Sequence, residues 1–519
     1  MPRPNRSSRP VPLPGPAIPS TTSWLSQSFS PSGPLPQAPA VTNQRPRPAT
    51  TRYPILDNEF QAQQQYAELP TAPASQPGDK PDATIVADMV PTLAPAPAPT
   101  LLTTFTGIGA TGWAPPDCAL AAGPNDVLLV VNSSVALYNK AGNQQWQITL
   151  DQWFTNVVQQ HKIFDPRALY DQYADRWVLV AGALGPANTQ ISLFLLSVSA
   201  TNDPNGPWHN YALDATLDGT VKTNNWGDYP TLGVDDKALY ITANMFVFNG
   251  NFAYAKIRII DKTGPYAGNL VSFTDIPNLK DPNNVSAFTV QPCHTYGPNP
   301  QAQYFVSAVF PGSDELVLWT LTNPLATPPT IAAQTIPVSK YNVPTKAQQQ
   351  GGGNTIDTGD TRLQNAVFRD GSVWTALTTR HNWGEPQNRA ALHWFQIDPV
   401  DPTGPALLQE GVFGASGTHY YYPAVMPEAR HGLVVVFCRS STTQFTGAHV
   451  SGRASGDPTG TLRPSAPLQV GLANYTNLQR WGDYAGIGLD PTAPNIVWTY
   501  TGFADANGNW STAAGSVQI

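Results

Sequence analysis

The sequence predicts an all-β protein: one β-propeller of about seven blades, preceded by a long proline-rich segment. Three observations predict this class. The stretch WGDYPTLGVD at residues 226–235 returns as WGDYAGIGLD at residues 481–490. Weaker copies of this motif also occur, and we call each copy an opening because we expect it to begin a blade. Successive openings lie roughly 45 to 70 residues apart, which is a spacing expected of propeller blades or solenoid repeats. No helical periodicity follows residue 100, so a helical solenoid is disfavoured.

The weaker openings fix the expected number of blades. Three of them begin with an acid, Asp117, Asp165 or Asp360, and continue into small or apolar residues. Two further openings, at residues 290–294 and 421–425, lack the acid. With the two full copies this makes seven openings, and six or eight blades remain open if one weak opening is miscounted.

Each opening is followed by short runs of β-branched and aromatic residues that end at Gly, Asn, Asp or Pro, as hairpin strands do. Units of three or four such strands are too small to bury their own faces, so they stack best around a common axis. The runs that predict these strands are residues 127–131, 176–180, 238–242, 304–308, 372–376, 433–437 and 496–500.

The stretch TLLTTFTG at residues 100–107 predicts a lone strand ahead of the first blade. The last blade is one strand short where the sequence ends at Ile519. We therefore expect the early strand to complete the last blade and close the ring, because closure removes exposed sheet edges. The propeller is expected to span residues 100–519.

Residues 1–99 differ in composition from the rest of the chain, since they hold roughly 22 of the 53 prolines. Proline prevents ladder hydrogen bonding and favours an extended, semi-stiff chain. Two interpretations stay open: a disordered tether, or an arm that docks on a neighbouring subunit and makes a homo-oligomer. The apolar anchors expected in the second case are Tyr53, Ile55, Leu56, Ile85, Val86, Met89 and Val90.

The composition excludes several classes of protein. A formal net charge of −7 argues against binding to a nucleic-acid backbone. No run of apolar residues is long enough to span a membrane. The cysteines Cys118, Cys293 and Cys438 lie too far apart for a CxxC-type zinc or redox site. Only 12% of residues are charged, which favours an extracellular or surface protein, although no signal peptide is readable.

Two turns, TNDPNGPW at residues 201–208 and SGDPTGTL at residues 455–462, share one order of residues. Aspartate accepts local N–H bonds, glycine supplies a positive φ, and Trp or Leu fills the space between sheets. With these turns the chain resembles the Asp-box blades of sialidase-like propellers, with one extra residue before the glycine. It is more similar to uncharacterised bacterial propeller proteins with the same WGDY openings. The resemblance covers residues 100–519 and implies the fold more than an activity.

If each opening begins an innermost strand, the acids of five openings lie at one mouth of the central channel, together with two arginines. Two interpretations stay open: the carboxylates cap backbone N–H groups of the next blade, or they form a ligand or metal site, for example for Ca²⁺. The residues of this rim are Asp117, Asp165, Asp228, Asp360, Asp483, Arg167 and Arg362.

No catalytic set is readable: the histidines show no metal-binding spacing, and no GxSxG, Walker or dinucleotide motif is present. The sialidase resemblance would imply an arginine cluster, a tyrosine nucleophile and a carboxylic acid, but the FRIP start and the glutamate beside the tyrosine are absent. The matching candidates are Arg167, Arg362, Arg480, Tyr229, Tyr484 and Asp228. We therefore predict a non-catalytic structural, self-assembling or adhesive subunit, the alternative being a glycan-binding protein or sialidase-like hydrolase acting at the rim.

Overall fold

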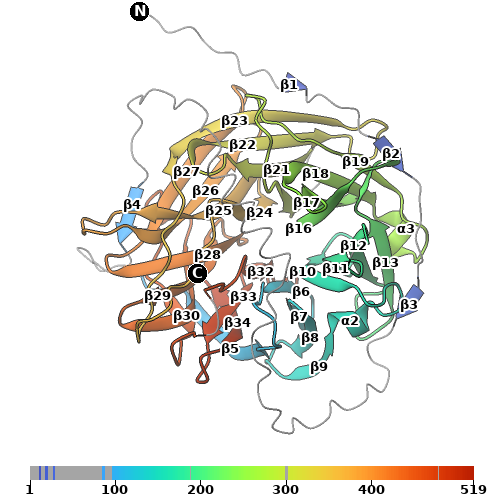
Figure 1. The fold of residues 1–519 in the computed structure, drawn as a ribbon. Helices are drawn as coiled ribbons and strands as arrows, with labels where there is room; N and C mark the ends of the chain where they lie inside the picture. Colours follow the sequence, from blue (N-terminus) through green and yellow to red (C-terminus); the bar gives the residue numbers. More distant parts are fainter. Residues whose placement is uncertain are drawn as a thin grey trace, which may run out of the picture.

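The computed structural model describes residues 96–519, apart from 188, 298–301 and 477–478, and the backbone of four short strands nearer the N-terminus. Within this part the chain forms seven blades of four antiparallel strands arranged around one axis (Figure 1). The inner strands of three neighbouring blades are also joined by parallel pairing, Val234↔His294 and residues 293–295 with 366–368, so that these blades form one continuous sheet. The predicted β-propeller and its seven blades are confirmed. Among the described residues no helix is long and apolar enough to cross a membrane.

Blades 1 to 4 are consecutive in sequence, and each runs from an inner strand at the axis to an outer strand at the perimeter. Blade 1 is β6 (Ala119–Ala122), β7 (Asp126–Val131), β8 (Ser134–Asn139) and β9 (Gln144–Thr149). Blade 2 is β10 (Lys162–Asp171), β11 (Arg176–Leu184), β12 (Ser192–Ser199) and β13 (Trp208–Asp214). Blade 3 is β16 (Asn225–Val234), β17 (Ala238–Val247), β18 (Phe252–Asp261) and β19 (Phe273–Ile276). Blade 4 is β20 (Gln291–Thr295), β21 (Gln303–Ala308), β22 (Ser313–Thr322) and β23 (Thr330–Tyr341).

The remaining blades follow the same plan. Blade 5 is β24 (Leu363–Arg369), β25 (Ser372–His381), β26 (Arg389–Asp398) and β27 (Ala406–Gly414). Blade 6 is β28 (Thr418–Pro427), β29 (Leu433–Ser441), β30 (Gln444–Arg453) and β31 (Ala466–Gln469). Blade 7 takes β32 (Gly486–Leu489), β33 (Val497–Ala504) and β34 (Trp510–Gln518) from the C-terminal end. The connections hold the short helices α2 (Leu150–Trp153) and α3 (Thr263–Tyr266) and the hairpin β14 (Leu217–Asp218) with β15 (Val221–Lys222).

Blade 7 is completed by β5 (Thr100–Gly109), which pairs antiparallel with β34 from Gln518↔Thr100 to Ser511↔Gly109. The predicted closure is therefore confirmed. Phe105 of β5 also stacks on Tyr138 of blade 1, with ring centroids 5.0 Å apart. One strand thus joins the last blade to the first.

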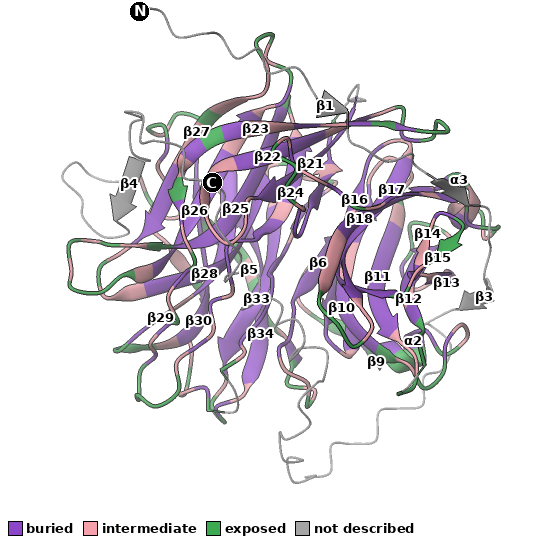
Figure 2. Ribbon diagram, turned by 45° about the horizontal axis from the view of Figure 1, so that its top comes forward, coloured by how far each residue is buried: buried purple, intermediate pink, exposed green. Residues whose placement is uncertain are grey.

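The core lies between neighbouring blades, and the inner and middle strands are buried along most of their length (Figure 2). Seven tryptophans are among the largest fully buried side chains. Trp208, at the end of the TNDPNGPW turn, is fully buried and donates its Nε1–H to the carbonyl of Pro204 at 3.0 Å. In the same turn Asp203 Oδ1 accepts from Asn205 N at 2.9 Å. This aspartate and this tryptophan therefore hold a turn together, as turn chemistry predicts.

The N-terminal segment forms four described strands, and each adds to the outer edge of a blade of the same chain. Three pair antiparallel: β1 (Val11–Pro12) with β23, β2 (Ile18–Ser20) with β19, and β3 (Gln27–Phe29) with β13. The fourth, β4 (Thr84–Ala87), runs parallel to β27, with Val412↔Ile85 and Phe413↔Val86 as partners.

The predicted anchors Ile85 and Val86 therefore lie in an added strand. The other predicted anchors, Tyr53, Ile55, Leu56, Met89 and Val90, lie outside the described residues. Strand addition is seen here within one molecule, and docking on a neighbouring subunit stays a prediction.

Candidate functional site at the central channel

A backbone position with positive φ recurs within or just before the inner strand of five blades. Asp117, Asp165, Tyr229, Thr289 and Tyr422 all have φ between 49° and 55°. This left-handed region is sparsely populated by residues other than glycine, so it persists only where the surroundings hold it. In blades 2, 3 and 6 the pairing with the second strand also shifts register here.

A polar side chain from the preceding blade holds three of these positions. Asn132, which follows β7, accepts the N–H of Asp165 through Oδ1 at 2.8 Å and donates Nδ2–H to the carbonyl of Pro115 at 3.1 Å. Its Nδ2 also donates to Asp117 Oδ2. Buried donors and acceptors need such partners, so Asn132 joins blade 1 to blade 2.

The same arrangement recurs on the far side of the ring. Asn244 Oδ1 on β17 accepts the N–H of Thr289 at 2.8 Å, and its Nδ2 donates to the Thr289 hydroxyl at 2.8 Å. Thr378 Oγ1 on β25 accepts the N–H of Tyr422 at 3.1 Å. We call the three bonds to the N–H groups of Asp165, Thr289 and Tyr422 the inter-blade clamps. They restrain strained residues at the blade junctions.

The five rim aspartates do not all share one backbone position. Asp117 and Asp165 share their backbone position with Tyr229, so Asp228 lies one residue earlier in its blade. The sequence comparison aligned the aspartates of the openings with one another. In the structure the equivalent position is the residue with positive φ, which is not an aspartate in every blade. A shift of one residue along a strand turns a side chain toward the other face.

All five rim carboxylates are buried, with at most 6% exposure. Asp117 Oδ1 accepts the N–H of Asp483 at 2.9 Å, which ties blade 1 to blade 7. Asp360 accepts from both Nε and Nη2 of Arg362 at 2.9 to 3.1 Å, and this fork geometry is a strong form of ion pair. Asp117 thus caps a backbone N–H group at the start of blade 7.

Asp483 forms an ion pair with Arg480 at 2.6 Å. With Asp360 bound to Arg362, at least two of the rim carboxylates are neutralised by arginine. Among the described residues no three His, Cys, Asp or Glu side chains lie together as a metal-ligand group. A ligand or metal site at the rim, for example for Ca²⁺, stays a prediction.

The tyrosines of the two WGDY copies meet across the axis. The rings of Tyr229 and Tyr484 lie edge to face with centroids 5.8 Å apart. The guanidinium carbon of Arg167 lies 3.2 Å from the Tyr484 centroid and 4.9 Å from that of Tyr229. Arg362 lies 4.4 Å from the Tyr229 centroid. We call Tyr229, Tyr484, Arg167 and Arg362 the aromatic plug. Cation–π contacts of this kind favour burial of both partners.

The plug tyrosines are neutral phenols at physiological pH. Burial raises the pKa of Tyr229 to about 12, even though Arg167 and Arg362 oppose the shift. Burial also raises the pKa of Tyr484 well above its usual value. The hydroxyl of Tyr484 donates to the carbonyl of Pro166 at 2.8 Å. A tyrosine nucleophile needs its proton removed, and these surroundings oppose that loss.

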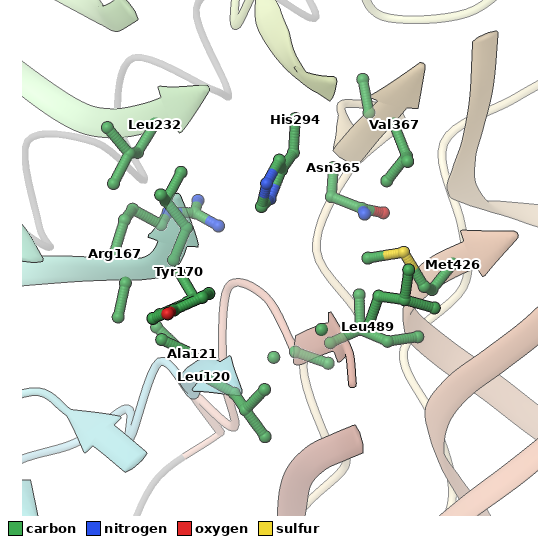
Figure 3. A pocket seen from close by; sticks show the side chains of 18 of the residues that line it. Leu120, Ala121, Arg167, Tyr170, Leu232, His294, Asn365, Val367, Met426 and Leu489 are labelled. Carbon is green, nitrogen blue, oxygen red and sulfur yellow. The ribbon is translucent and has the colours of Figure 1, made fainter. Parts of the chain in front are cut away.

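The cavity at the centre of the ring has a volume of about 90 Å³ and is lined by residues of all seven inner strands (Figure 3). Pockets for drug-sized ligands are larger, roughly 300 to 1,000 Å³, so this one suits a few waters better than a sugar. Arg167 reaches into it from one side (Figure 3). Its Nη2 and the Oε1 of Gln364 are buried without a hydrogen-bond partner among the described residues.

A second polar group lines the cavity on β20, where His294 stacks on Tyr296 with ring centroids 4.2 Å apart. His294 Nε2 lies 2.9 Å from Gln172 Oε1, which requires the ring to donate its proton there. Burial, reinforced by the positive charge of Lys262, lowers the pKa of His294 to about 3. The ring is therefore neutral, and its role here is to link blades 2 and 4.

Sequence reasoning found Arg167, Arg362 and the plug tyrosines but missed the groups that hold them. Asn132, Asn244 and Thr378 were passed over because each is a single polar residue at or near the end of an apolar run. Their common place in the later part of the second strand of a blade, or directly after it, is the signal that could have found them.

No family model matches the chain, and no curated protein matches it. Among solved structures, a protein of unknown function from Dyadobacter fermentans DSM 18053 is similar at 9% identity and TM-score 0.38, over 82% of this chain and 100% of that one. A Trypanosoma rangeli sialidase solved with the inhibitor DANA is similar at 7% identity and TM-score 0.34, over 77% and 57%. An α-L-arabinofuranosidase from Fusarium graminearum is similar at 9% identity and TM-score 0.29, over 66% and 89%. Such scores are too low to carry an argument about function, so the fold assignment rests on the seven blades themselves.

Proposed function

We propose that the protein is a non-catalytic β-propeller that acts as a structural, self-assembling subunit outside the cell or at its surface. The observation that carries this proposal is the addition of β1 to β4 to the outer edges of four blades. Backbone pairing at a sheet edge is a common way for proteins to capture an extended peptide. Every copy of the chain offers both the strands and the edges.

The reach of the segment decides which strands can serve a second copy. Residues 88–99 join β4 to β5 and span at most about 40 Å when extended, which keeps β4 close to its own disc. Residues 30–83 separate β3 from β4 and span about 180 Å when extended. The strands β1 to β3 can therefore leave their own blades and fill the same edges of a neighbour, as in domain swapping.

The channel supports the non-catalytic part of the proposal. Its arginines are occupied by tyrosine rings or by Asp360, and its phenols hold their protons firmly. The five carboxylates of the rim are all buried. The buried position of these residues agrees with a role in holding blades together.

The experiment that tests assembly compares particle sizes of three chains by light scattering and negative-stain microscopy. Full-length protein is expected to form closed oligomers or filaments, whereas a chain that starts at Pro99 is expected to be a folded monomer. A chain that starts at residue 30 retains β4 and loses β1 to β3, so it is expected to be monomeric as well. Identical monomers in all three samples would overturn the proposal.

A second candidate function, glycan binding or sialidase-like hydrolysis, is favoured by one observation: the unpartnered Nη2 of Arg167 at the cavity. A glycan array and fluorogenic sialosides test it directly. A true signal should fall in Arg167→Ala and Arg362→Ala proteins that remain folded. Silence in both assays would remove this candidate.

A further inference from the structure

The guanidinium of Arg167 has hydrogen-bond donors that the surrounding protein leaves unused. Its Nε donates to the carbonyl of Pro230 at 3.2 Å, whereas Nη2 is buried without a hydrogen-bond partner among the described residues. The tyrosine rings of the aromatic plug lie against this guanidinium, but a ring accepts only weak hydrogen bonds. Arg167 therefore keeps donor capacity at the wall of the central cavity.

Arg167 also differs from the other arginines of the rim in its charge partner. Arg362 pairs with Asp360 at 2.9 Å and Arg480 pairs with Asp483 at 2.6 Å. Among the described residues no carboxylate forms an ion pair with Arg167. Arginine stays protonated in proteins, and a partly buried charge is costly unless an opposite charge accompanies it. A small anion beside Arg167 would remove this cost.

A second unsatisfied group, Gln364 on β24, lines the same cavity and is 1% exposed. Its Nε2 donates to the carbonyl of Arg362 at 3.4 Å, and this bond sets which end of the amide carries the oxygen. The Oε1 is buried and accepts no hydrogen bond from the described residues. A buried acceptor without a donor is costly. The cavity thus offers a ligand both donors, on Arg167, and an acceptor, on Gln364.

The other walls restrict the charge of a ligand. Among the described residues that line the cavity, Arg167 alone is charged, since the ring of His294 is neutral. Asn365 faces the cavity (Figure 3), but its amide is already used: Nδ2 donates to the carbonyl of Val425 and Oδ1 accepts the N–H of Val425, both at 3.0 Å. Apolar side chains form much of the remainder, among them Leu232, Val367, Met426 and Leu489. The site therefore suits an anion with a single negative charge.

The volume of about 90 Å³ restricts its size. A cavity of about 150 Å³ holds benzene, so this one holds a ligand of about four non-hydrogen atoms. Two acceptor oxygens in one plane match the planar fork of a guanidinium, and one O–H group would satisfy Gln364. Bicarbonate has this size, this charge and these groups.

We infer that the central cavity binds bicarbonate, with two of its oxygens accepting hydrogen bonds from Arg167 and its hydroxyl donating to Oε1 of Gln364. The inference rests neither on self-assembly nor on glycan binding. The particle-size experiment and the sialoside assays can therefore fail without affecting it, and the reverse also holds.

Isothermal titration calorimetry of the full-length protein with bicarbonate tests the inference, at mildly alkaline pH and constant ionic strength. Nitrate is the matched ligand, because it has the same planar shape and charge but no hydroxyl to donate to Gln364. Bicarbonate is expected to bind, and nitrate is expected to bind at least about tenfold more weakly. Equal affinities would overturn the assignment of bicarbonate, and so would the absence of bicarbonate binding.

A variant that supplies its own anion gives a second test. Gln364→Glu adds a carboxylate at the cavity, which would pair with Arg167 and repel bicarbonate, so the affinity for bicarbonate should fall at least about tenfold. The matched control is Gln159→Glu, which makes the same charge change at an exposed position and should bind as the wild type does. Thermal unfolding shows whether each variant is folded. Unchanged bicarbonate binding by folded Gln364→Glu protein would overturn the inference.

Discussion

At the scale of single residues, polar side chains at the channel rim form hydrogen bonds that join neighbouring blades. Asn132 binds groups from the first two blades and approaches the residue that joins blade 1 to blade 7. A buried amide that satisfies several partners is costly to remove, because those partners are left without bonds in a dry environment. The polar groups of the rim thus stabilise the folded propeller, and this accounts for their presence better than a catalytic role does.

An Asn132→Ala substitution should lower the free energy of unfolding by about 2 to 4 kcal/mol, because it removes the acceptor of the Asp165 N–H and one donor to the Asp117 carboxylate. Urea denaturation of the purified variant measures this. Asn143→Ala, at an exposed position of the hairpin between β8 and β9, is the control and should change stability by less than about 0.5 kcal/mol. Similar stability of both variants would contradict the role given to Asn132.

Two substitutions of Tyr484 distinguish a packing role of the ring from a role of the hydroxyl group. Tyr484→Phe keeps the ring against Arg167 and loses one hydrogen bond, so it should cost about 1 kcal/mol. Tyr484→Ala removes the ring and should cost about 3 to 5 kcal/mol. Thermal unfolding of the two variants provides the comparison. A Phe variant as unstable as the Ala variant would contradict the packing role.

At the scale of elements, the predictable parts are those with a repeated pattern. The hairpin strands, the number of blades and the closing strand follow from β-branched runs at a regular spacing. The rim register did not follow, since the sequence was aligned on acids while the left-handed residue is Tyr229 in one blade and Asp165 in another. The places of β1 to β4 could not be predicted, because strands of two to four residues bind through backbone groups that carry no pattern.

The closing strand can be tested by truncation. A chain that starts at Ala96 keeps β5 and should unfold cooperatively, whereas a chain that starts at Ala110 leaves blade 7 with three strands and exposes β34. The shorter chain is expected to lose cooperative unfolding or to aggregate, as open edges do. Near-ultraviolet circular dichroism and thermal scans measure this, and equal midpoints for both chains would contradict the role of β5.

At the scale of the whole molecule, the disc buries several histidines in the neutral form. Burial lowers the pKa of His294 and of His449 to about 3 and that of His419 to about 4, with Arg389 adding to the shift of His419 and Arg439 to that of His449. In the unfolded chain each histidine takes up a proton below about pH 6.5. The stability that they contribute is therefore complete above that pH and is lost as the pH falls toward the folded values.

This predicts an acid-sensitive fold. Between pH 6 and 4.5 each buried histidine should add up to about 1.4 kcal/mol per pH unit to the slope of unfolding free energy. Urea unfolding over this range, with His449→Gln and His419→Gln, should show a slope reduced by one proton in each variant. His431→Asn, whose wild-type side chain is 69% exposed, is the comparison variant outside the core. A wild-type slope near zero would contradict the prediction.

The closing strand also determines when the ring can close during translation. β5 leaves the ribosome about 400 residues before its partner β34, and at roughly 5 to 20 residues per second the wait lasts tens of seconds. During that time an uncharged strand without a sheet must be kept from pairing elsewhere. The ring can be sealed only after β34 emerges, so a chain that is cut short within blade 7 would form a disc that cannot close.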